Sequence, residues 1–86
     1  MSQPRLFLYV KEGCPWCAEA ESFLRRHSLA YDKVDVISDA AAFARMREVS
    51  GQIKAPVMEF GEDREILADF GEDELAPFLR DRGVIT

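Results

Sequence analysis

The fold is decided by one stretch of sequence, RLFLYVKEGCPWC, at residues 5–17. Arg5–Val10 is an almost continuous apolar run, which is typical of a strand buried on both faces. The polar break at Lys11–Gly13 ends that strand. Cys14 then stands where a helix N-cap is expected, and Pro15 fits the first helical position, where its missing N–H costs nothing. The stretch therefore predicts a strand, a short turn and a helix that begins with two cysteines.

The two cysteines are three residues apart, so they lie on adjacent turns and can exchange a disulfide. Cys14 lies at the positive end of the helix dipole, among unpaired N–H groups that favour an anion, and Lys11 adds a positive charge nearby. Cys17 lies one turn inside the helix, where we expect it to remain a thiol. We therefore predict that Cys14 attacks a disulfide and Cys17 resolves the mixed disulfide, while Trp16 shapes the substrate surface.

Two other interpretations of the cysteine pair are weaker. A zinc site normally needs a second pair of ligands, and the only histidine, His27, is expected to be a solvated residue at a helix C-terminus. A structural disulfide between Cys14 and Cys17 would close a very small loop and constrain little. The preceding strand and the following helix favour redox catalysis.

Periodicity and turn residues predict five more elements. They are a strand at Tyr31–Val36, a helix capped by Ser38 or Asp39 and ended by Gly51, strands at Pro56–Phe60 and Glu65–Asp69, and a last helix from Glu72 or Asp73 to about Gly83. The resulting order, β-α-β-α-β-β-α, predicts an α/β fold with a four-stranded mixed sheet flanked by helices. Six aromatic residues are expected in the core: Phe7, Tyr9, Phe23, Phe43, Phe60 and Phe78.

Length and charge restrict the possible functions. The chain has 86 residues, which is enough for a single domain at 1–86. Its formal net charge of −5 argues against a nucleic-acid partner, because phosphate binding needs a basic patch. No apolar run approaches the roughly 18–20 residues of a membrane span, and no secretory signal is apparent. We therefore expect a cytoplasmic protein with no membrane partner, whose thiols are kept reduced.

Three stretches resemble the glutaredoxins, a family with the thioredoxin fold. They are Tyr9–Cys17 with its Cys-Pro-Trp-Cys motif, Ser50–Val57, and the acidic helix start after Gly71. The resemblance implies a glutathione-dependent enzyme that reduces protein disulfides and glutathione mixed disulfides, acting as a monomer. Cys14 would become glutathionylated, and Pro56 would match the family's cis-proline. The implied glutathione site consists of Lys11, Trp16, Lys54, Ala55, Pro56 and Asp73.

The chain departs from the family pattern in three places. Lys54-Ala55-Pro56 replaces Thr-Val-Pro, and Phe43 aligns with a Gln or Arg that helps bind a glutathione carboxylate, a role that Arg47 or Lys54 could take over. Asp69-Phe70-Gly71 replaces a Gly-Gly pair. Asp73 still offers a carboxylate for the glutathione amino group, although acidic residues at a helix start also match the helix dipole.

These departures leave two alternatives open. One is an electron donor that thioredoxin reductase recharges, for example a donor to ribonucleotide reductase. The other is a [2Fe–2S] carrier in which Cys14 and glutathione hold a cluster in a dimer. Pro15 argues against the carrier, because cluster-binding relatives tend to have a smaller or more flexible residue there.

Overall fold

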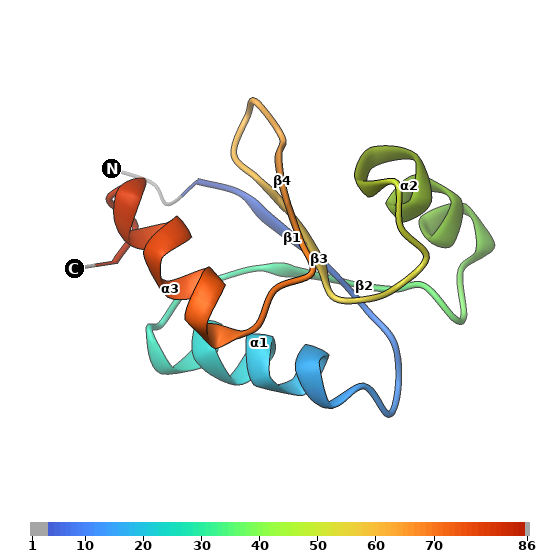
Figure 1. Ribbon diagram of the computed structural model, residues 1–86, viewed down its shortest axis with the longest axis horizontal. Helices are drawn as coiled ribbons and strands as arrows, with labels where there is room; N and C mark the ends of the chain where they lie inside the picture. The colour runs from blue at the N-terminus through green and yellow to red at the C-terminus, as the bar shows by residue number, and fades with distance from the viewer. Residues whose placement is uncertain (1–3, 86) are drawn as a thin grey trace.

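The computed structural model describes residues 4–85 and contains the seven expected elements in the expected order (Figure 1). They are β1 (Leu6–Val10), α1 (Pro15–Arg26), β2 (Asp32–Asp35), α2 (Ala40–Ser50), β3 (Val57–Phe60), β4 (Glu65–Ala68) and α3 (Glu72–Asp81).

The four strands form one mixed sheet in the order β2-β1-β3-β4. β1 pairs in parallel with β2, and β3 is antiparallel to both β1 and β4. Tyr9 lies opposite Val34 on one side and Val57 on the other. This is the thioredoxin fold that the sequence predicts.

The helices lie on both faces of the sheet, with α1 and α3 on one face and α2 on the other (Figure 1). Because successive side chains of a strand point to opposite faces of the sheet, β1 contributes side chains to two hydrophobic cores. The larger core lies under α1 and α3, and it contains Leu6, Leu8, Val10, Cys17, Ala20, Phe23, Leu24, Met58, Phe60, Phe70, Leu75 and Leu79. The smaller core lies under α2 and consists of Tyr9, Val36, Ala42, Met46 and Val57. Cys17, the predicted resolving cysteine, is thus part of the larger core.

Several details differ from the sequence predictions. β2 spans only Asp32–Asp35, although Val36, just beyond it, still donates its N–H to the carbonyl of Val10 and buries its side chain. β4 ends at Ala68, because Asp69 has a left-handed φ of 54°. The core also differs: Phe7, Phe43 and Phe78 are only half-buried, whereas Phe70 is fully buried.

The helix ends follow the sequence signals. The Asp39 carboxylate accepts the N–H groups of Ala41 and Ala42, and Gly51 ends α2 with a φ of 71°. Gly71 precedes α3, and its N–H donates to the Glu74 carboxylate over 2.6 Å. None of the helices within residues 4–85 has the length and apolar character needed to cross a membrane.

Candidate active site

Cys14 is the N-cap residue of α1, as predicted. Its backbone is extended, with φ −94° and ψ 110°, and Pro15 occupies the first helical turn. The Cys14 sulfur accepts the backbone N–H of Cys17 over 3.2 Å and is half-buried. No acidic residue lies in the first turn of α1. The positive end of the helix dipole and the Cys17 N–H therefore lie at the sulfur, with no carboxylate of this turn beside it.

Cys17 has a different environment. Its side chain is 2 % exposed, and both cysteines are free thiols. Burial raises the pKa of Cys17 to about 12, and hydrogen bonding with Cys14 contributes to the rise, while the backbone N–H of Lys11 opposes it. Cys17 therefore remains protonated at neutral pH. This asymmetry fits the predicted roles of an attacking Cys14 and a resolving Cys17.

The loop before β3 brings Ala55 and Pro56 to the cysteines. The Ala55–Pro56 peptide bond is cis, as the resemblance implies. The Cys14 sulfur lies 3.8 Å from the Ala55 carbonyl oxygen, although the two residues are 41 positions apart in sequence. A substrate held along Ala55 would therefore have its sulfur close to Cys14.

A groove adjoins this contact and has a volume of about 220 Å³. It is lined by Trp16, Lys54, Ala55, Pro56, Asp69 and Phe70. The Trp16 side chain is 58 % exposed, which agrees with its predicted place on the substrate surface. Its indole covers Gly71 so closely that a Cβ there would lie 2.5 Å from Trp16 Cζ3. Four of the six residues of the implied glutathione site line this groove.

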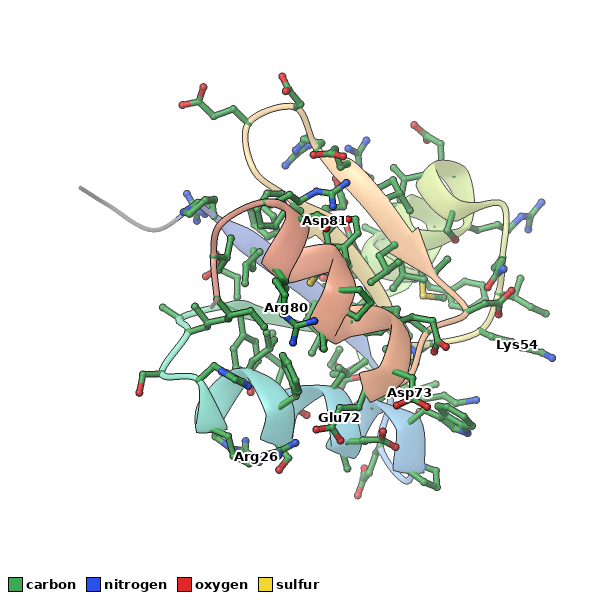
Figure 2. All side chains as sticks on the ribbon, turned by 60° about the vertical axis from the view of Figure 1, so that its left-hand side comes forward. Arg26, Lys54, Glu72, Asp73, Arg80 and Asp81 are labelled. Carbon is green, nitrogen blue, oxygen red and sulfur yellow. The ribbon has the colours of Figure 1, made fainter. Side chains whose placement is uncertain are left out.

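Lys11 and Asp73 lie outside the groove lining. Lys11 is exposed and lines a second hollow together with Cys14 and Cys17. Asp73 is exposed in the first turn of α3 (Figure 2), whereas its neighbour Glu72 pairs with Arg26 over 2.5 Å. The role of Asp73 therefore stays a prediction.

Of the two basic residues considered as substitutes at the Phe43 position, only Lys54 reaches the groove. Arg47 lies with Phe43 on α2, where both line a separate hollow. His27 ends α1 as an exposed residue, and its ring packs against Phe23 at 4.4 Å between centroids. Within residues 4–85, no group of three or more His, Cys, Asp or Glu side chains is arranged to hold a metal ion.

Two residues of the site, Asp69 and Gln52, are not among those that the sequence predicts. Asp69 lines the groove, and its carboxylate accepts a hydrogen bond from the Gln52 side chain over 2.5 Å. This bond ties the loop before β3 to the loop after β4. The one sequence feature that points to Asp69 is the replacement of the family's Gly-Gly pair by Asp69-Phe70-Gly71. This replacement puts a charged side chain where the family pattern has glycine.

A buried carboxylate was also missed. Glu59 in β3 is 1 % exposed and faces α2 beside Tyr9. It accepts hydrogen bonds from the Tyr9 hydroxyl and from Arg45, and it lies 3.6 Å from Arg64. Burial raises the pKa of Glu59, but the hydrogen bonds of Tyr9 and Arg45 outweigh it and hold the pKa below its ordinary value. The sequence feature that points to this residue is a charged side chain within the apolar strand β3.

Fold and site together define a thioredoxin-fold protein with two free cysteines, Cys14 and Cys17, at the start of its first helix. The thioredoxin-like protein BC3987 has such a fold: its crystal structure matches with a TM-score of 0.75 and 30% identity, covering 86% of this chain and 99% of that chain. The family model for glutaredoxin matches residues 6–65. The chain therefore belongs to the glutaredoxin family.

Two curated relatives match shorter segments. The glutaredoxin of Neisseria meningitidis serogroup B is 34% identical over 56 residues, which are 64% of this chain and 66% of the relative. The hybrid peroxiredoxin hyPrx5 of Haemophilus influenzae is 29% identical over 59 residues, which are 69% of this chain and 24% of the relative. The chain thus spans less than two thirds of the length of either relative.

Proposed function

We propose that this protein is a glutathione-dependent dithiol–disulfide oxidoreductase, acting as a cytoplasmic monomer on protein disulfides and glutathione mixed disulfides. The observation that carries the proposal is the position of the Cys14 sulfur. It caps α1, accepts the Cys17 N–H over 3.2 Å, and lies 3.8 Å from the carbonyl oxygen of Ala55.

The reaction consists of two exchanges. The Cys14 thiolate attacks a substrate disulfide, forms a mixed disulfide and expels one substrate thiolate, which takes up a proton. Cys17 loses its proton and attacks the Cys14 sulfur, so that the second substrate thiol leaves and a Cys14–Cys17 disulfide remains. Two glutathione molecules then return the dithiol and become glutathione disulfide. Each cycle moves two electrons from glutathione to the substrate.

The charges around Cys14 support glutathione as the reductant. Glutathione carries two carboxylates, and Lys11 and Lys54 are exposed cations beside Cys14 and in the groove, respectively. The backbone of Ala55 can pair with the cysteine of glutathione as an added strand would.

The test is a coupled assay with glutathione, glutathione reductase, NADPH and a glutathione mixed disulfide. We expect turnover by the wild type, none by Cys14→Ser, and partial activity in Cys17→Ser, because exchange with glutathione can proceed through Cys14 alone. Lys11→Ala should raise the KM for glutathione severalfold. Arg80→Ala removes a charge from the exposed surface of α3 and is the matched control. Absence of glutathione-linked turnover by the wild type would refute glutathione dependence.

One observation favours a second reductant, thioredoxin reductase. Asp69 places a carboxylate in the groove, where it opposes the carboxylates of glutathione. Replacing glutathione and glutathione reductase with thioredoxin reductase in the same assay separates the two candidates. NADPH consumption in only one arm identifies the reductant.

A further inference from the structure

The groove beside Cys14 combines an aromatic face with a carboxylate. The Trp16 side chain is 58 % exposed, and Asp69 lines the same groove. An aromatic face attracts a cation through its quadrupole, and a carboxylate attracts it through charge and hydrogen bonds. Together these groups have the chemistry that binds a guanidinium or ammonium group, and they line the same groove as Ala55, whose carbonyl oxygen lies 3.8 Å from the Cys14 sulfur.

The Asp69 carboxylate is held in place. Its backbone has φ 54°, a conformation that few residues other than glycine adopt, and Asp and Asn are among those that tolerate it. Gln52 donates to one carboxylate oxygen over 2.5 Å. Among residues 4–85, no Lys, Arg or His side chain forms an ion pair with Asp69. Its negative charge is therefore available to a substrate.

Lys54 is the opposing charge in this groove. It does not lie within ion-pair distance of Asp69 in the described part of the chain, and its side chain extends away from the body of the molecule (Figure 2). The Asp69 carboxylate, by contrast, is held by its hydrogen bond from the Gln52 side chain. A basic substrate residue can therefore approach Asp69 and Trp16, while Lys54 remains in solvent.

We infer that Asp69 is a specificity-determining residue, which makes the groove select disulfide-bearing polypeptides with a basic side chain beside the cysteine. This inference rests on the proposed function, because it names the substrate class of the same dithiol. The chemistry is unchanged: the protein dithiol becomes a disulfide, and one peptide disulfide becomes two peptide thiols.

The test uses the reduced protein and symmetric disulfides of short peptides. In each peptide the cysteine is flanked on both sides by arginine, glutamate or alanine, so that attack at either sulfur reports the same neighbour. The second-order rate constant of a single turnover is measured without glutathione. Reaction of the same peptides with a small dithiol corrects for their intrinsic reactivity.

We expect the corrected rate constant to favour arginine over glutamate about fivefold at low salt, and the preference to vanish at about 1 M salt, where charges are screened beyond about 3 Å. Asp69→Asn is the decisive variant, since Asn tolerates the same φ and can accept the same hydrogen bond. It should lower the preference to less than about twofold, and Lys54→Ala should raise it. Asp63→Asn, in the β3–β4 turn, makes the same change in net charge and should leave the preference intact.

Three results would overturn the inference: a wild type without preference, a preference that Asp69→Asn retains, or an equal loss in Asp63→Asn. If the alanine peptide reacts normally in these cases, the proposed dithiol chemistry stands and only the selectivity fails. If no peptide reacts, both fail together. If the protein shows the preference but does not use glutathione, the inference about Asp69 stands and only the proposed reductant is wrong.

Discussion

The backbone N–H of Cys17 donates to the Cys14 sulfur over 3.2 Å, and this contact joins two thiols with opposite environments. Cys14 is half-buried at the positive end of α1, whereas Cys17 is 2 % exposed in the core beneath it. The Cys14 sulfur is both a hydrogen-bond acceptor at a helix N-terminus and the atom that Cys17 attacks in the proposed mechanism. The same geometry fits the proposed roles of Cys14 as the nucleophile and Cys17 as the resolving thiol.

The first prediction concerns thiol reactivity. Iodoacetamide at neutral pH should modify Cys14 and leave Cys17 intact, because only a thiolate reacts and burial raises the pKa of Cys17 to about 12. In Cys14→Ser, the remaining thiol should react at an appreciable rate only well above neutral pH, because its burial still raises its pKa although the contribution of Cys14 is gone. Mass spectrometry of alkylated peptides measures both rates. Rapid modification of Cys17 in the native variant near neutral pH would contradict the assignment.

Much of this site could be predicted from the sequence, because its signals are local. The apolar run of β1, the cap at Cys14 and the proline that follows fix the strand, turn and helix within a dozen residues. The contact of Cys14 with Ala55 is different, since it joins residues 41 positions apart. It was anticipated only through the family resemblance and not through any pattern in the residues themselves.

The features that were missed depend on tertiary contacts. Asp69 enters the groove because its φ is positive and Gln52 bonds it, and no periodicity reports either fact. Glu59 lies in a strand whose other three residues are apolar. Its charge is therefore conspicuous in the sequence, but the sequence does not show which side chains bind the carboxylate. Arg45 and Tyr9 reach it from α2 and β1, and only the packed fold brings them together.

The second prediction concerns Gly71, which the Trp16 indole covers. A Cβ at this position would lie 2.5 Å from Trp16 Cζ3, so Gly71→Ala must displace the ring. Because Trp16 is largely exposed, we expect it to swing outward, with a stability loss below about 1 kcal/mol. The fluorescence of this single tryptophan should shift, and disulfide reduction should slow severalfold as the groove loses one wall.

A double-mutant cycle separates that effect from general damage to α3. In a Trp16→Ala background, Gly71→Ala should change neither the unfolding free energy nor the rate of disulfide reduction, since the group that it displaces is absent. If Gly71→Ala remains harmful there, helix α3 and not the indole requires the glycine.

The third prediction concerns the pH dependence of stability through Glu59. Its pKa is raised by burial but held, on balance, below the ordinary value of 4.5 by hydrogen bonds from Tyr9 and Arg45. The folded state therefore binds a proton less readily than the unfolded state. The stabilising contribution of the carboxylate is fully present above about pH 4.5 and is lost as the pH falls through the lower pKa of the folded state.

Glu59→Gln tests this, because it keeps the shape of the side chain, removes the charge and leaves one acceptor oxygen in place of two. At neutral pH we expect the variant to be less stable than the wild type by about 1–3 kcal/mol, since Arg45 and Arg64 lose their partner in a buried site. Urea unfolding from neutral pH to about pH 3 should show the difference shrinking below about pH 4.5. Glu62→Gln, in the exposed turn after β3, should match the wild type throughout. A difference that stays constant with pH would mean that Glu59 contributes through packing and not through its charge.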